Sequence, residues 1–154
     1  MNIGIFYNRD QAEPSVADGL ARSVQTAGHA AAVFSRLEEI GGVDRLIVLG
    51  GDGTILRVAK RASALGIPIF GVNFGTLGFL TEFEREECDA AVSLALDERC
   101  ARIDRSMLEA ELNGEKFDCL NELALLHPIA PGKENKVVTI SVTIDGSHAG
   151  EFVA

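Results

Sequence analysis

Short apolar runs alternate with helical patterns over the first part of the chain. Four runs have the composition of strands buried on both faces of a sheet, and they are residues 3–7, 30–34, 46–49 and 67–72. Apolar residues recur at helical spacing between and after these runs, which predicts helices over 15–27, 55–65 and 85–96. Strands separated by helices favour a parallel sheet with right-handed crossovers. The expected fold class is therefore α/β, a parallel sheet with flanking helices.

The pattern changes from helical spacing to alternation near residue 98. Apolar and polar residues alternate over 107–112 and 138–144, as in antiparallel strands with one buried and one solvated face. Asn113-Gly114 and Asp145-Gly146 directly follow these stretches. Such pairs favour two-residue hairpin turns with positive φ angles. The second part of the chain therefore predicts antiparallel strands joined by tight turns.

Two domains follow from this change of pattern. We expect a Rossmann-like α/β domain over residues 1–97 and the start of an antiparallel β domain over residues 98–154. A few antiparallel strands form one small sheet, and its apolar face needs a further layer to cover it. The last residues lie inside an apparent strand without a turn or cap. We therefore expect that the chain is a fragment or that another chain supplies the missing layer.

The composition argues against a disordered chain and against a basic nucleic-acid interface. Apolar residues make up 47% of the 154 residues, which is enough to build a hydrophobic core. Asp and Glu number 23 against 14 Lys and Arg, so the net charge is −9. A surface this acidic repels phosphate backbones, so we expect no nucleic-acid partner. An anionic ligand would have to be held by backbone N–H groups, metal ions and a few placed cations.

Cysteine usage and the absence of targeting signals favour a cytoplasmic location. Cys88, Cys100 and Cys119 show no CxxC spacing, and their odd number is typical of a reducing compartment. The N-terminal residues lack the basic and long apolar segments of a secretory signal. No apolar run approaches the ~20 residues of a membrane span. We therefore expect no membrane partner.

A glycine-rich turn, Gly50-Gly51-Asp52-Gly53-Thr54, separates an apolar strand from the next helical pattern. Its glycines let the backbone turn tightly and approach a ligand closely, and the N–H groups of the following helix favour phosphate. Asp52 does not fit a simple phosphate cradle, because a carboxylate repels phosphate. It fits if it accepts a proton from an attacking hydroxyl or helps to hold a metal ion. The alternative is an ordinary turn in which Asp52 or Thr54 caps the helix.

Three motifs occur in order along the chain. The turn Gly50–Thr54 resembles the phosphate loop shared by NAD kinases, diacylglycerol-type lipid kinases and phosphofructokinases. Residues 71–80, Gly-Val-Asn-Phe-Gly-Thr-Leu-Gly-Phe-Leu, are similar to a loop of pattern GxNxGxLGFL, and Asn121-Glu122 is similar to an Asn-Glu motif. Together the motifs resemble the bacterial NAD kinase family over essentially the whole chain. The family's later Thr-Pro-Thr-Gly-Ser run does not occur here, so we expect the C-terminal part of the family pattern to be missing.

The resemblance implies an enzyme that transfers the terminal phosphoryl group of ATP or polyphosphate to NAD. The acceptor would be the 2′-hydroxyl of the adenosine ribose, the product NADP, and Asp52 the general base. The resemblance also implies a divalent cation, usually Mg²⁺, which compensates the charge of the transferred phosphoryl group. NAD and ATP are therefore the expected partners, and relatives commonly assemble through the β domain into dimers or tetramers.

Further residues match binding positions of the family. The resemblance implies that the contacts with NAD or ATP come from the turn, the following loop and the Asn-Glu motif, namely Gly51, Asp52, Gly53, Thr54, Asn73, Phe74, Gly75, Asn121 and Glu122. Arg57 matches an arginine that could reach a phosphate, but its helical position also fits a solvated face. Lys136 stands where relatives often carry a ligand contact, although an exposed lysine at a strand end is the simpler interpretation. No metal ligand is assigned, because the histidines, His127 among them, lack a second ligand at metal spacing.

Two other functions stay open on the sequence. The chain could be a catalytically incomplete nucleotide-binding fragment of the same family, which would bind nucleotides without turnover. It could also be a lipid or sugar kinase that shares the glycine-rich turn, although the 71–80 loop argues against that class. Formation of NADP from NAD and ATP separates these possibilities.

Overall fold

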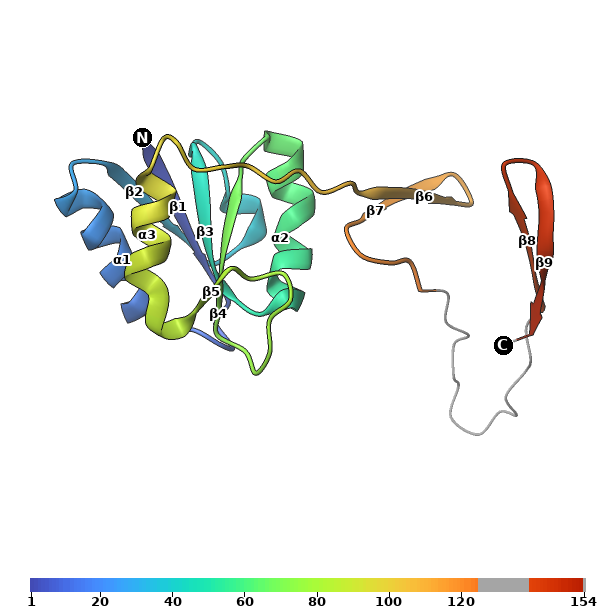
Figure 1. Ribbon diagram of the computed structural model, residues 1–154, viewed down its shortest axis with the longest axis horizontal. Helices are drawn as coiled ribbons and strands as arrows, with labels where there is room; N and C mark the ends of the chain where they lie inside the picture. Colours follow the sequence, from blue (N-terminus) through green and yellow to red (C-terminus); the bar gives the residue numbers. More distant parts are fainter. Residues whose placement is uncertain (125–138, 154) are drawn as a thin grey trace. The chain divides into compact units, whose positions relative to one another are not determined.

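Five parallel strands form the main sheet of the structure, a computed structural model that describes residues 1–124 and 139–153 (Figure 1). The strands are β1 (Asn2–Tyr7), β2 (Ala30–Phe34), β3 (Arg45–Gly50), β4 (Ile69–Asn73) and β5 (Phe83–Glu84). Their order in the sheet is β2-β1-β3-β4-β5. Every neighbouring pair is parallel, which confirms the predicted α/β fold class.

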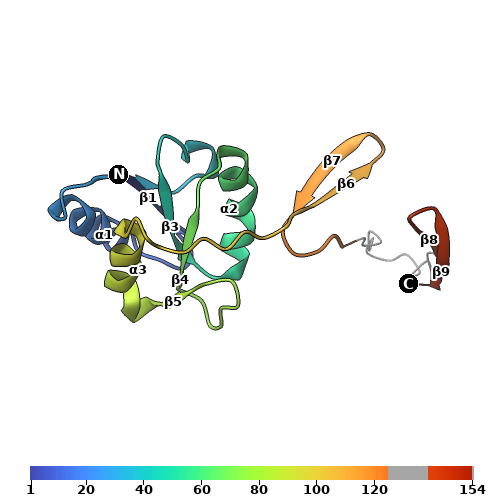
Figure 2. The same cartoon turned by 45° about the horizontal axis from the view of Figure 1, so that its top comes forward.

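Helices cover both faces of this sheet. They are α1 (Pro14–Thr26), α2 (Asp52–Leu65) and α3 (Cys88–Leu96). α1 and α3 lie on one face and α2 lies on the other, in both views (Figure 1, Figure 2). Short 3₁₀ turns occur at Leu37–Glu39 and Arg85–Glu87. The middle residues of β1, β3 and β4 are apolar because each face of the sheet packs against a helix.

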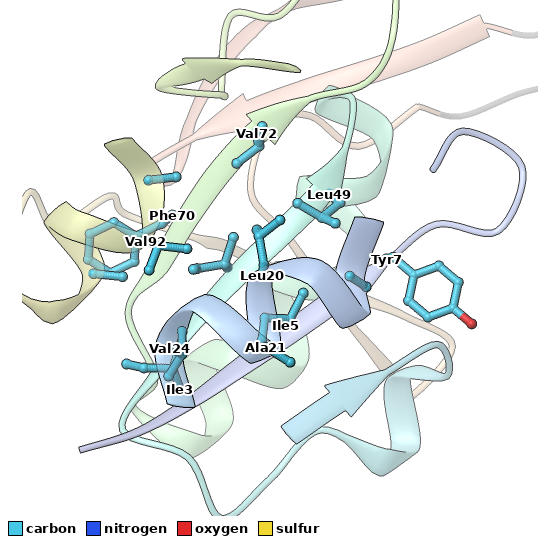
Figure 3. Packing of buried hydrophobic residues seen from close by; sticks show 14 of the residues in the cluster. Ile3, Ile5, Tyr7, Leu20, Ala21, Val24, Leu49, Phe70, Val72 and Val92 are labelled. Atoms are coloured by element: carbon cyan, nitrogen blue, oxygen red, sulfur yellow. The ribbon is translucent and has the colours of Figure 1, made fainter. Parts of the chain in front are cut away.

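Strand β3 shows how one strand supplies two halves of the core. Ile47 and Val48 are both fully buried, with 0% exposure. Ile47 belongs to the apolar cluster under α1 and α3, whereas Val48 belongs to the cluster under α2. On the first face, Leu20 and Val24 of α1 lie over Ile5 of the neighbouring strand (Figure 3). Successive side chains therefore serve opposite layers, as expected for a central parallel strand.

The predicted elements are present, but some of their boundaries differ. Helix α2 begins at Asp52 rather than at residue 55, because the carbonyl of Gly51 already accepts the N–H groups of Thr54 at 2.8 Å and Ile55 at 3.2 Å. The helix predicted over 85–96 is a 3₁₀ turn followed by α3. Strand β5 was not predicted, since a two-residue strand is too short to show a period.

Two antiparallel hairpins follow the α/β part. One pairs β6 (Leu108–Leu112) with β7 (Glu115–Cys119), and the other pairs β8 (Thr139–Ile144) with β9 (Ser147–Val153). The turn residues have positive φ angles: 53° at Asn113, 85° at Gly114, 49° at Asp145 and 79° at Gly146. These angles are those of the two-residue turns predicted from the sequence.

The chain divides into two compact units, Met1–Glu122 and Leu123–Ala154. The domain boundary expected between residues 97 and 98 stays a prediction. His127 and Lys136 lie outside the described residues. Among the helices described, none combines the length and the apolar composition needed to cross a membrane.

Candidate active site

The direction in which strands are added to the sheet reverses between β1 and β3. From β1 the sheet continues to β2 on one side and to β3 on the other. In open α/β sheets, the carboxyl ends of two such strands border a crevice where ligands bind. Asn8 follows β1, and the glycine-rich turn Gly50–Thr54 follows β3 at the same edge, where the N–H of Asn8 donates to the carbonyl of Leu49 at 3.0 Å. The candidate site is built at this edge.

The turn between β3 and α2 contains glycines at positions where a side chain would clash with a neighbour or cover the start of the helix. A Cβ atom on Gly50 would overlap the side chain of Thr54, so the turn has no room for a larger residue there. A Cβ atom on Gly51 would lie 3.9 Å from the Cα atom of Gly75, because two loops pass close together here. Nothing lies within 4 Å of a Cβ atom built on Gly53. The first turn of α2 is therefore open beside Gly53, at the positive end of the helix dipole, where an anion can approach.

Asp52, the first residue of α2, directs its carboxylate to the loop after β4. Oδ1 accepts the N–H of Leu80 at 2.9 Å and that of Phe79 at 3.1 Å, and Oδ2 accepts the N–H of Phe79 at 3.0 Å. The residue is half-buried. A carboxylate has about four acceptor positions, so two N–H groups leave room for a further donor. Asp52 therefore joins the glycine-rich turn to the loop and keeps the capacity to bind a hydroxyl.

Thr54 is buried, with 3% exposure. Its hydroxyl binds residues that follow β1 and not the N–H groups at the start of α2. Its hydroxyl donates to Oε1 of Gln11 at 3.1 Å and accepts from Nδ2 of Asn8 at 3.0 Å. Gly51 occupies the N-cap position of α2, with no side-chain cap. The alternative interpretation, in which Asp52 or Thr54 caps this helix, is therefore wrong. Both side chains bind other segments instead.

Asn8 and Gln11 contact the glycine-rich turn although no motif marks them. Oε1 of Gln11 accepts the N–H of Gly51 at 3.2 Å and Nδ2 of Asn8 at 2.9 Å, in addition to the hydroxyl of Thr54. These two residues were not predicted as site residues. Their position in the turn that follows the first strand is the signal that could have found them, since polar residues there reach the carboxyl edge of the sheet.

Asn73 and Phe74 are buried at the start of the 75–80 loop, and their side chains contact other residues of the protein. Asn73 is 4% exposed, and its side chain accepts the N–H of Gly75 at 2.9 Å and donates to Glu84 at 3.1 Å. Phe74 is 8% exposed, and the guanidinium of Arg85 lies 4.6 Å from its ring centroid. These side chains already have partners in the protein and shape the loop. Their contact with a ligand stays a prediction.

The remaining predicted residues lie at the surface. Asn121 and Glu122 are exposed and bind each other, from Nδ2 to Oε2 at 2.8 Å. Within the described ranges, no hydrogen bond joins this pair to Asp52. Arg57 is exposed on α2 and forms no ion pair with another described residue. The roles of all three in ligand binding stay predictions.

The fold and the site define an open, doubly wound α/β protein, in which a glycine-rich turn leads from a parallel strand into a helix at the edge where such sheets bind ligands. Residues 7–100 match the family model of the ATP-NAD kinase N-terminal domain. This match covers more than half of the chain. The chain therefore belongs to the NAD kinase family.

Curated relatives carry the name of this family. An NAD kinase of Clostridium botulinum (strain ATCC 19397 / Type A) is 37% identical over 121 residues, which make up 76% of this chain and 42% of that protein. An NAD kinase of Aromatoleum aromaticum is 36% identical over 140 residues, which make up 90% of this chain and 45% of that protein. The chain thus spans less than half the length of these relatives.

Solved structures share the fold. An NAD kinase from Archaeoglobus fulgidus in complex with ATP superposes with a TM-score of 0.73 and 22% identity, over 99% of this chain and 57% of that one. Yeast NADH kinase complexed with NADH superposes with a TM-score of 0.60 and 18% identity, over 98% of this chain and 54% of that one. At such identities the likeness shows the fold alone.

Proposed function

We propose that this protein acts as an NAD kinase, which transfers the terminal phosphoryl group of ATP to NAD and forms NADP. Membership of the family supports this proposal. The observation that carries it is the position of Asp52, whose half-buried carboxylate lies at the open first turn of α2. A proton acceptor beside a helix N-terminus suits phosphoryl transfer to a hydroxyl, because the helix end favours phosphate and the carboxylate can take the hydroxyl proton.

The proposed step is an in-line displacement at the terminal phosphorus of ATP. The 2′-oxygen of the adenosine ribose forms the new O–P bond, the bond to the β–γ bridging oxygen breaks, and ADP leaves with that electron pair. The hydroxyl proton passes to the carboxylate of Asp52. A ribose hydroxyl is a weak nucleophile at neutral pH, so the protein contributes by holding it in line and accepting its proton.

Backbone N–H groups are the proposed ligands of the phosphates. The chain has a net charge of −9, so a triphosphate meets few cations to bind. The first turn of α2 offers the positive end of the helix dipole, and Gly53 leaves its own backbone uncovered there. We propose that Gly51, Gly53 and Thr54 lie against phosphate, with the N–H of Gly53 as a donor, because the N–H groups of Gly51 and Thr54 already bind Gln11 and the carbonyl of Gly51. Arg57, exposed one turn further along α2, would add a cation.

Mg²⁺ fits this site as part of the nucleotide substrate. In the ranges that the structure describes, no group of His, Cys, Asp and Glu side chains could hold a metal ion by itself. Mg²⁺ commonly keeps several waters and binds mainly through substrate phosphates. We therefore propose that the ion enters on the triphosphate. ATP is favoured as the donor because the similar Archaeoglobus fulgidus structure is in complex with ATP, and polyphosphate stays an alternative donor.

The dinucleotide is proposed to contact the exposed polar groups that follow β7. Asn121 and Glu122 offer amide and carboxylate groups at the surface, which suit the hydroxyls of a ribose. The loop that starts with Asn73, Phe74 and Gly75 would lie on the other side of the bound NAD. Yeast NADH kinase, which shares the fold, is complexed with NADH. We therefore also propose a direct comparison of NAD and NADH as acceptors.

The decisive experiment is an assay of NADP formation by the full-length protein with NAD, ATP and Mg²⁺. We expect turnover by the wild type and a loss of roughly 10²–10⁴-fold for Asp52→Asn, because the amide cannot accept the proton. Asp89→Asn is the matched control, since Asp89 is an exposed residue in the first turn of α3. Normal turnover by Asp52→Asn would remove Asp52 from the role of base.

The same preparation distinguishes the alternative functions. A rise of the melting temperature with NAD or ATP, without any NADP, would indicate a nucleotide-binding module that lacks catalysis. Transfer of phosphate from ATP to a diacylglycerol or a sugar instead of NAD would indicate a different kinase that shares the turn. NADP formation excludes both outcomes.

We also propose a cytoplasmic location and a homo-oligomeric assembly. The cysteines Cys88, Cys100 and Cys119 are free thiols, which suits a reducing compartment. Apolar side chains on the hairpin strands are exposed, among them Leu108 at 55% and Phe152 at 56%, and such surfaces are typically covered by another layer. Sedimentation of the full-length protein tests the dimer or tetramer.

A further inference from the structure

The side chain of Gln11 lies between the two loops of the candidate site. Its Oε1 atom accepts three hydrogen bonds, from Nδ2 of Asn8 at 2.9 Å, the N–H of Gly51 at 3.2 Å and the hydroxyl of Thr54 at 3.1 Å. Its Nε2 atom would lie 3.5 Å from a Cβ atom on Gly51 and 3.4 Å from one on Gly75. Gln11 therefore fills the space between the glycine-rich turn and the 75–80 loop.

The backbone of Gln11 is itself held in place. Its N–H donates to the carbonyl of Asn8 at 3.0 Å, which closes a turn directly after β1. Its carbonyl accepts Nη2 of Arg85 at 3.4 Å, and the same guanidinium lies over the ring of Phe74. The backbone of Gln11 is thus fixed by Asn8 and by Arg85, and its side-chain amide oxygen extends from this fixed backbone into the site.

The contacts of Gln11 bracket Asp52 along the chain. Gly51 precedes Asp52 and Thr54 follows it by two residues, and both bind the same oxygen. Gln11 holds Gly51 through its backbone N–H and Thr54 through its side-chain hydroxyl. Fixing these two neighbours sets the direction in which the side chain of Asp52 leaves the helix. That direction brings its carboxylate to the N–H groups of the 75–80 loop.

We propose that Gln11 is a positioning residue for the phosphoryl transfer, which acts through Gly51 and Thr54 to aim the carboxylate of Asp52 at the reacting hydroxyl. This inference rests on the proposed function. Without the amide oxygen, three donors lose their acceptor, and the hydroxyl of Thr54 is buried where water cannot easily replace it. The turn then rearranges and Asp52 changes direction. A misplacement of about 1 Å is enough to lower turnover by roughly 10²-fold.

Two variants of Gln11 distinguish the effect of its hydrogen-bond acceptor from the effect of its side-chain volume. Gln11→Leu keeps the approximate volume but has no acceptor, whereas Gln11→Glu keeps acceptor oxygens at the same reach. Gln25→Leu is the matched control, because Gln25 is an exposed glutamine on α1. All are made in the full-length protein, and the Asp52→Asn variant supplies the background rate.

Steady-state kinetics is the first measurement. For Gln11→Leu we expect kcat to fall by roughly 10–10²-fold with little change in the KM for NAD. For Gln11→Glu we expect most of kcat to return, and its added charge near the phosphates to raise the KM for ATP. A wild-type kcat in Gln11→Leu would overturn the inference. So would a Gln11→Glu variant that folds and is as slow as Gln11→Leu.

Amide hydrogen exchange supplies a second measurement that needs no activity. The N–H groups of Phe79 and Leu80 are bound by Asp52, so their exchange reports where that carboxylate points. We expect faster exchange at both amides in Gln11→Leu and wild-type exchange in Gln11→Glu and Gln25→Leu. Unchanged exchange in Gln11→Leu overturns the inference, whether or not the wild type forms NADP. A wild type that forms no NADP overturns the proposed function instead.

Discussion

The carboxylate of Asp52 accepts the backbone N–H of Leu80 at 2.9 Å, across 28 positions of the sequence. This hydrogen bond joins the first turn of α2 to the loop that follows β4. The proposed base is therefore also an anchor of that loop. A change at Asp52 is expected to alter the position of the loop as well as the transfer of a proton.

Removing the carboxylate should loosen the loop without unfolding the protein. In Asp52→Ala we expect faster amide exchange at Phe79 and Leu80 and a loss of about 1–2 kcal/mol of stability, because bonds to a charged acceptor near a helix N-terminus are lost. Asp89→Ala, in the first turn of α3, controls for the helix charge. Wild-type exchange at both loop amides in Asp52→Ala would show that the loop is held by other contacts.

The Gly50→Ala variant should be destabilised by about 1–3 kcal/mol. Its Cβ atom would overlap the buried side chain of Thr54, and α2 would have to move away from β3 to make room. Urea unfolding monitored by circular dichroism measures this loss. A variant with wild-type stability would show that Thr54 can turn away at little cost.

Gly53→Ala should separate stability from function. Nothing lies within 4 Å of the added Cβ atom, and alanine favours the helix, so we expect unchanged or slightly higher stability, by at most about 1 kcal/mol. The methyl group would occupy the space in which the phosphates are proposed to lie. We therefore expect a higher KM for ATP in the NADP assay, and an unchanged KM would argue that the phosphates bind elsewhere.

The core of the α/β part should be sensitive at Ile47. This residue has 0% exposure and packs in the cluster between the sheet and α1, so Ile47→Ala should cost about 2–5 kcal/mol. Val33→Ala on β2, where Val33 is 37% exposed, should cost much less. Urea unfolding of the two variants checks the contrast, and equal losses would contradict the assignment of this core.

The thiol of Cys88 should react slowly with iodoacetamide. Burial against the apolar cluster, and then the charge of Asp89, raise the pKa of this thiol. A raised pKa leaves less thiolate at pH 8, so alkylation should be slower than in the urea-unfolded chain and should speed up as the pH rises. Mass spectrometry of the labelled peptide measures both rates. Equal rates in the folded and unfolded protein would show that the thiol is solvated.

The strand and helix pattern was predictable because its causes are local. Buried parallel strands are continuous apolar runs, and amphipathic helices repeat every three to four residues. The turn at Asn113 and Gly114 was predictable for the same reason, since few residue pairs tolerate two positive φ angles. The start of α2 was placed too late because Asp52 and Gly53 carry no apolar period. Their helical conformation comes from the backbone bonds to Gly51.

The candidate site was predictable only in part. Asp52 and the glycines stand in one short motif, and their residue types favoured a phosphate site in which Asp52 accepts a proton or helps to hold a metal ion, with an ordinary capped turn as the alternative. The contacts of Gln11 were not predictable, because its partners Gly51 and Thr54 lie 40 and 43 positions away. The motif also did not reveal which group Asp52 contacts in the fold.

The sequence by itself determined the alternation of strands and helices, the glycine-rich turn and the two hairpin turns, because each depends on residues next to one another. Only the tertiary structure decided that β1 lies between β2 and β3, and so which loops meet at one edge of the sheet. That arrangement brings Gln11 to the turn and Asp52 to Leu80. Hydrogen bonds between distant segments depend on how the whole core packs, and local preference does not specify them.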